Sequence, residues 1–154
     1  METIQIKRNN VYKIDILDDE DKTKGTIEFD VEDIGLSFKC LKSLEAIEKL
    51  KETARLKEYS ILKKQDQPGD YISKNEEAIL NLWQETFNEM RNAMDIFLGD
   101  GACTLIFGDR NYPTMFEDLM EQLMPHIDKM GISFENVKDR IAKKYSINKE
   151  QVIE

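Results

Sequence analysis

The chain has one histidine, His126, and its neighbours decide whether it could do chemistry. In a helix, the residues one turn before it are Gln122 and Leu123, which supply neither a carboxylate nor a thiol. A zinc site needs three or four converging ligands, and histidine-based catalysis needs a nucleophile within reach. The sequence therefore predicts neither a metal site nor acid–base catalysis at this residue.

Two other segments have the composition of ligand-binding loops. The turn Gly99-Asp100-Gly101 follows a predicted helix, with Thr104 where the third glycine of G-x-G-x-x-G would stand, and no Lys-Ser or Lys-Thr follows. The acidic run at residues 18–21 lacks the alternating ligands and central glycine of a calcium loop. We interpret the first as a corner between helices and the second as a hairpin tip, and we expect no cofactor.

A remaining possibility is an acidic enzyme site built around Asp100, Asp109 and Glu117. No combination of base, nucleophile and oxyanion donor can be assembled around these carboxylates from the sequence. We therefore predict that the protein is not an enzyme.

Composition and charge restrict the classes of partner. The chain has 154 residues, 40% of them hydrophobic, which suits one domain with a core. Its 22 basic and 31 acidic residues give a net charge of −9, which argues against nucleic acid or an anionic membrane as partner. Acids dominate residues 85–128 and bases dominate residues 138–149. These segments are either solvated helix faces or surfaces for head-to-tail self-association.

The cysteines and the first residues of the chain indicate in which cellular compartment the protein works. Cys40 and Cys103 lie far apart in apolar surroundings, as expected for two buried thiols in a reducing environment. No signal-peptide pattern opens the chain, and no stretch approaches the roughly 20 apolar residues of a membrane span. We expect a soluble, cytoplasmic protein.

The first third of the chain has the pattern of β-strands. Apolar residues alternate with polar ones in two runs, and the polar segment 18–25 between them suits a hairpin loop. Residues 3–7 are a candidate third strand. The alternating apolar positions are Val11, Ile14 and Ile16 in the first run and Ile27, Phe29 and Val31 in the second.

Helical spacing begins after Asp33 and predicts a first long helix up to about Lys64, followed by a break at residues 65–70. Ser73, with Glu76 three residues on, is the predicted N-cap of a second long helix, which Gly99 ends. The sequence thus predicts two long helices joined by a short polar connection.

Shorter helices follow. Asp100 is the predicted cap of a helix that ends at Gly108, and Pro113 suits the first turn of the next. Pro125 should kink or end that helix near Leu123, because it removes a backbone donor. A last helix is predicted from Ser133.

The predicted fold is α+β, with a small N-terminal antiparallel β-sheet followed by four to five packed helices. Residues 1–66 form the hairpin and first long helix, residues 71–146 a helical subdomain, and residues 147–154 a frayed tail; the two larger parts pack as one unit.

The second half concentrates methionine and phenylalanine between its glycines. Core filling is one interpretation of these residues. The other is a methionine-lined groove for an amphipathic segment of another protein, since methionine adapts to varied apolar surfaces. The residues predicted to contact such a partner are Met94, Phe97, Leu98, Phe107, Met115, Phe116, Leu119, Met120 and Leu123.

The same stretch resembles the tail assembly chaperones of long-tailed bacteriophages and prophages of Gram-positive bacteria. The resemblance lies in the corner at residues 97–99, the Phe107-Gly108 end of a short helix and the amphipathic segment 115–123. It extends over about residues 26–130 and includes the F-D-V-E-D-I stretch at residues 29–34.

The resemblance implies a non-enzymatic protein that coats the helical, apolar tape measure protein and keeps it soluble before tail assembly. It also implies homo-oligomers, displacement by the tail tube protein and, in many members, a longer frameshifted product. An acidic surface and an adaptable apolar one suit this role.

Two other interpretations stay open. The pI of about 4.8 and the acidic middle segment suit a mimic of DNA that inhibits a basic partner. A structural subunit of the virion is the second, and it would be found in purified particles.

Overall fold

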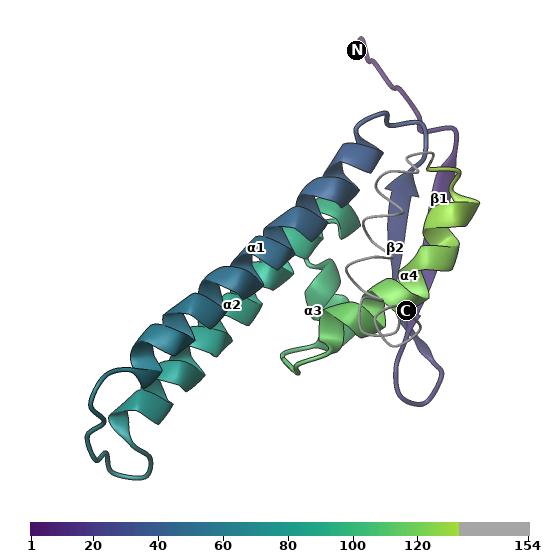
Figure 1. Ribbon diagram of the computed structural model, residues 1–154. Helices are drawn as coiled ribbons and strands as arrows, with labels where there is room; N and C mark the ends of the chain where they lie inside the picture. Colours follow the sequence, from purple (N-terminus) through teal and green to yellow (C-terminus); the bar gives the residue numbers. More distant parts are fainter. Residues whose placement is uncertain (133–154) are drawn as a thin grey trace, which may run out of the picture.

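The computed structural model describes residues 1–132 of the chain. In this part, a two-stranded antiparallel sheet is followed by four helices, so the fold is α+β as predicted (Figure 1). The helix predicted from Ser133 and the tail at residues 147–154 lie outside the described residues.

The sheet is a single hairpin of β1 (Val11–Leu17) and β2 (Thr23–Asp30). Tyr12 pairs with Phe29 and Ile14 with Ile27, and the register shifts near Ile16 and Leu17. Ile27 and Phe29 are buried, which is the core face that the alternating pattern predicts. The polar loop between the strands is a hairpin tip, as predicted, because the Asp18 carboxylate accepts two backbone N–H groups within it.

The predicted third strand at residues 3–7 is absent from the described part of the chain, where the sheet has two strands only. Ile4 and Ile6 are exposed and have no strand beside them. The prediction failed because alternation identifies a segment that could pair, whereas a strand also requires a partner for its backbone groups.

Two long helices form a hairpin that projects away from the sheet (Figure 1). They are α1 (Leu36–Leu62) and α2 (Lys74–Leu98). The Ser73 hydroxyl accepts the backbone N–H of Glu76, so the predicted N-cap of α2 is confirmed. Gly99, with φ of 107°, ends α2 as predicted.

The short helix α3 (Ala102–Phe107) lies between this hairpin and the sheet (Figure 1). The prediction that Asp100 caps it is wrong, since its N-cap is Gly101 and no side chain caps from that position. Asp95, near the end of α2, accepts the N–H groups of Gly101 and Cys103 instead. A carboxylate from the preceding helix therefore satisfies the first turn of α3.

The helix α4 (Met115–Lys129) begins two residues after Pro113 and packs beside β1. It does not end near Leu123, so the expected stop is wrong: Pro125 lies inside the helix. Proline removes the hydrogen bond to the carbonyl four residues earlier, which belongs to Glu121. Glu121 is exposed, so water can bind that carbonyl and the helix continues.

Candidate protein-binding surface

The nine residues predicted to contact a partner lie mostly in the core. Eight are buried and Phe107 is half-buried against the same cluster. They are therefore not an open surface in this conformation, and any surface that holds another protein must lie elsewhere. The buried eight are Met94, Phe97, Leu98, Met115, Phe116, Leu119, Met120 and Leu123.

The sheet and α4 cover these residues. The Phe29 ring of β2 lies 5.2 Å from the Phe97 ring of α2, centroid to centroid, and Phe116 of α4 lies 6.1 Å from Phe107. The methionines fill the same core: Met90, Met94, Met115, Met120 and Met130 are buried and Met124 is partly so. Of the two interpretations of the methionines, core filling is confirmed.

The polar residues of this region have structural partners. Arg91 donates to the carbonyl oxygens of Gly108 and Arg110 and to the side-chain oxygen of Asn111, which fastens α2 to the segment before α4. Lys51 of α1 donates to Glu117 of α4 over 2.5 Å. These contacts hold α2 to the segment before α4 and α1 to α4.

The three carboxylates of the candidate acidic site, Asp100, Asp109 and Glu117, do not form a cluster either. Asp100 and Asp109 are exposed, and Glu117 is paired with Lys51. Within residues 1–132, no group of three or more histidine, cysteine, aspartate or glutamate side chains is arranged to hold a metal ion.

The two cysteines are free thiols and both are buried, as predicted. Burial raises the pKa of Cys40 to about 12. Burial also raises the pKa of Cys103, and the Asp95 carboxylate beside it adds to the shift. Both thiols therefore stay protonated at neutral pH, which makes them poor nucleophiles.

The candidate surface lies on the part of the helical hairpin that extends beyond the core. Ala54 of α1 and Thr86 of α2 are buried, but no residue from 55 to 85 is. This segment, which we call the arm, comprises the end of α1, the connection and the start of α2. Its two helices are held to each other by half-buried residues and are covered by no other described element (Figure 1).

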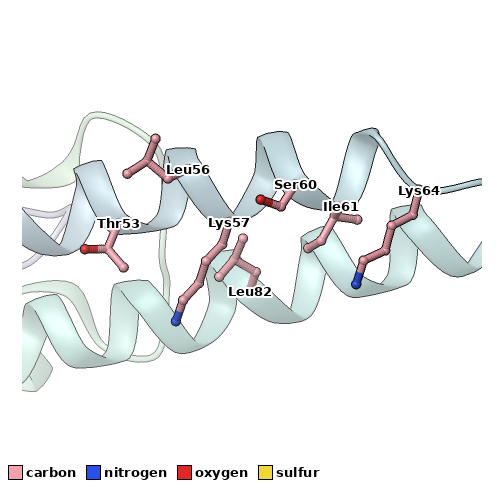
Figure 2. A pocket seen from close by; sticks show the side chains of 7 residues that line it. All are labelled: Thr53, Leu56, Lys57, Ser60, Ile61, Lys64 and Leu82. Carbon is pink, nitrogen blue, oxygen red and sulfur yellow. The ribbon is translucent and has the colours of Figure 1, made fainter.

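An open groove runs along one flank of the arm between its two helices. Figure 2 shows the Lys57 and Lys64 side chains reaching from α1 toward α2, with Leu82 of α2 between the helices. The groove thus has an apolar floor and two ammonium groups along its length. It is lined by Thr53, Leu56, Lys57, Ser60, Ile61, Lys64 and Leu82.

The opposite flank of the arm is also apolar. Tyr59 and Leu62 of α1 are 60% and 61% exposed, and Leu80 of α2 is 63% exposed. A helix turns by about 100° per residue, which places Tyr59 and Leu62 well away from Lys57 and the groove. Large apolar side chains on both flanks of one projecting segment are typical of a protein-binding surface.

Sequence reasoning missed the arm because it followed the apolar stripe at three- and four-residue spacing. Leu56, Tyr59, Leu62 and Leu80 fall outside that stripe, and such off-stripe apolar residues were the available signal. Their clustering near the ends of two adjoining helices, beside a polar break, is the pattern that could have identified an exposed tip.

No protein-family model, curated protein or solved structure matches this chain. In the described residues, no helix is both long enough and apolar enough to cross a membrane.

Proposed function

We propose that this protein holds an amphipathic helical segment of another protein in the groove of the arm. The observation that carries the proposal is the absence of any buried residue between positions 55 and 85, although both helices there carry large apolar side chains. Exposed apolar surface of this kind is unfavourable in water and is stabilised when a partner covers it.

The groove favours a particular client. Ile61 and Leu82 form an apolar floor between the helices, Leu56 lies at the outer edge of the groove on α1, and the ammonium groups of Lys57 and Lys64 can pair with carboxylates at the edge of an incoming helix (Figure 2). A helix with an apolar stripe bordered by acidic residues fits this arrangement. The flexible lysine stems adapt to different spacings, so the groove can accept successive segments of a long client.

We further propose that the client is the tape measure protein of a tailed phage and that the protein is a tail assembly chaperone. The resemblance at residues 97–99, 107–108 and 115–123 supports this assignment. The structure uses those residues for corners and core, so on this proposal they maintain the fold while the arm makes the contacts. Displacement of the client by the tail tube protein belongs to the same proposal.

Co-expression with a candidate tape measure protein tests the proposal. The double substitution Leu56→Asp, Lys57→Glu should leave the fold intact, since both side chains are exposed, but should move the client into the insoluble fraction. Ile34→Asp alters an apolar side chain outside the arm that is even more exposed than Leu56, 96% against 62%, and is the control. A parent that does not raise the solubility of the client would overturn the proposal. So would a double variant that solubilises the client as well as the parent does.

The DNA-mimic alternative has less support from the contacts. Several acids of the segment 85–128 serve the fold: Asp95 binds the first turn of α3, Glu117 pairs with Lys51, and Asp118 accepts the Thr114 hydroxyl. A phosphate-like array needs carboxylates that stay available to a basic partner.

A further inference from the structure

The outer edge of β1 has no strand beside it within residues 1–132. The Val31 N–H binds the Asn10 carbonyl over 3.1 Å, which continues the register of the hairpin. Backbone groups point to alternate sides along a strand, so those of Val11, Lys13 and Asp15 point away from β2. None of these three residues makes a backbone hydrogen bond with another described element. An edge of this kind is a template for a further strand.

The apolar face of the hairpin is covered less completely at β1 than at β2. Ile27 and Phe29 of β2 are 5% and 2% exposed. Their counterparts on the same face of β1 are only half-buried, and these are Tyr12, Ile14 and Ile16. A strand beside β1 with apolar residues two positions apart therefore extends this face and covers β1 further.

Residues 3–7 have the pattern that this edge requires. Ile4 and Ile6 are 91% and 92% exposed, and polar residues alternate with them. Figure 1 shows the N-terminal segment projecting beyond the sheet. Isoleucine favours a pleated, half-buried surface, and two such side chains in water are unfavourable. The segment is therefore a strand that lacks a partner in its own copy.

We infer that residues 3–7 of one copy pair with the outer edge of β1 of a second copy, and that the exchange is reciprocal. An antiparallel register sets Ile4 opposite Ile14 of the other copy. The same register sets Ile6 opposite Tyr12. Both isoleucines then lie on the apolar face, beside the half-buried residues of β1.

A two-fold axis between the two copies of Asn9, perpendicular to the sheet, relates the two pairings. In a chain that runs straight from residue 3 to residue 17, the backbone groups of residues 3, 5 and 7 point to the same side as those of residues 11, 13 and 15. Both copies therefore offer matching groups at once. The hydrogen-bonded pairs are Thr3 with Asp15, Gln5 with Lys13 and Lys7 with Val11.

This register keeps the helices of the two copies apart. Ile4 of one copy lies opposite Ile14 of the other, so the two Ile14 residues are about ten positions apart along the paired strands. At about 3.3 Å per residue this separation is about 33 Å. The helices of each copy therefore lie over their own end of the shared sheet.

Charge favours this segment as the occupant of the edge. Residues 3–8 carry two basic side chains and no acidic one. Residues 11–30, which form the hairpin, carry three basic and seven acidic side chains, a net charge of −4. The segment and the hairpin of a second copy therefore attract each other, although the whole chain carries −9.

The exchange requires a change only at residues 8–10. The chain bends at Asn9, and Arg8 forms an ion pair with Glu28 of its own β2 over 3.0 Å. The two side chains are 53% and 39% exposed, and ion pairs of this kind contribute little. Straightening the link releases this pair and keeps the bond between Asn10 and Val31.

A tight turn onto the chain's own β1 does not give the same contact. With Asn10 held in β1 by Val31, a two-residue turn consists of Arg8 and Asn9. Such a turn sets Ile4 opposite Lys13, because it shifts the register by one residue. Both isoleucines then lie on the polar face of the sheet, so pairing between copies is the better solution.

The double substitution Ile4→Cys, Ile14→Cys tests the register. The two positions form a non-hydrogen-bonded pair between copies, in which side chains are close enough for a disulfide. Mild oxidation should therefore give a covalent dimer on a non-reducing gel. Ile4→Cys, Lys13→Cys is the matched control: Lys13 is exposed but lies on the opposite face, so this variant should stay largely monomeric.

Two results of the oxidation would overturn the inference. One is a monomer with an internal disulfide between positions 4 and 14, since the segment then folds back on its own strand. The other is a control variant that forms covalent dimers as readily as the Ile14 variant. The native Cys40 and Cys103 are buried and should not take part.

Sedimentation equilibrium without oxidation tests the strength of the association. Ile6→Asp should raise the dimer dissociation constant about tenfold or more, since the carboxylate enters the apolar face at both ends of the dimer. Ile34→Asp, at an apolar side chain that is 96% exposed and outside the segment, should leave the constant unchanged. A parent that stays monomeric at high micromolar concentration would contradict the inference. These measurements contain no client, so their results are independent of the proposed chaperone role.

Discussion

The hydroxyl oxygen of Tyr12 lies 2.7 Å from Nδ1 of His126 and joins the first strand to the last described helix, 114 residues further along the chain. The two rings meet edge to face with centroids 5.7 Å apart. The chain's one histidine therefore has a structural partner, and the contact ties α4 to β1.

Tyr12→Phe should remove this hydrogen bond and keep the ring contact. We expect the free energy of unfolding to fall by about 1 kcal/mol, the usual net value of such a bond. Urea denaturation followed by circular dichroism measures the change. Tyr71→Phe, at a fully exposed tyrosine, is the control and should have no effect. Equal stability of the two variants would show that the Tyr12 bond contributes nothing.

Arg91→Met should destabilise the protein more than Tyr12→Phe does. The variant keeps an apolar stem but loses three hydrogen bonds from the guanidinium group, two of them to backbone carbonyls. Hydrogen bonds to charged groups are the stronger class, and we expect a loss of about 2–3 kcal/mol. Arg110→Met is the comparison, because the Arg110 side chain lies over the Tyr112 ring and is largely exposed. A smaller effect at Arg91 than at Arg110 would contradict the prediction.

The two thiols should resist modification in the folded protein. Cys40 and Cys103 are both buried, and the pKa of Cys40 is raised to about 12. At pH 8 the folded protein should react with a thiol-specific chromogenic disulfide far more slowly than the urea-unfolded chain, in which both thiols are accessible. Rapid labelling of one equivalent in the native state would show that a cysteine becomes exposed by local opening.

The connection between α1 and α2 should respond to acid through Asp66. Hydrogen bonds from the Ser73 side chain and from the backbone N–H groups of Asn75 and Gln67 hold the pKa of Asp66 below its ordinary value of 3.8. A lowered pKa in the folded state means that the ionised carboxylate stabilises this connection above the unfolded pKa. That stabilisation is lost as the pH falls through the folded pKa.

A carboxyl NMR titration should therefore give Asp66 a midpoint below 3.8, and Ser73→Ala should move the midpoint upward, since the Ser73 hydroxyl is the largest cause of the shift. Asp66→Asn should remove most of the acid sensitivity of the connection. A midpoint at or above 3.8 in the parent would contradict the hydrogen-bonded arrangement.

Local signals in the sequence determined most of the element order. Alternating residues predicted the hairpin of β1 and β2, the Ser73 cap fixed the start of α2, and Gly99 fixed its end. These signals act within a few residues of each other, so the backbone obeys them wherever the segment lies in the fold. Asp100 was the wrong cap because a carboxylate one turn earlier, on Asp95, reaches the same N–H groups.

Only the tertiary structure decided which apolar residues are covered. Periodicity shows which face of a helix is apolar, but it does not show how much of that face another element reaches. Here α1 and α2 have 27 and 25 residues, about 40 Å each, whereas strands of seven and eight residues span only about 25 Å. The sheet and α4 therefore cover Phe97 and Phe116. Because α1 and α2 extend beyond the sheet and α4, Tyr59 and Leu80 stay uncovered.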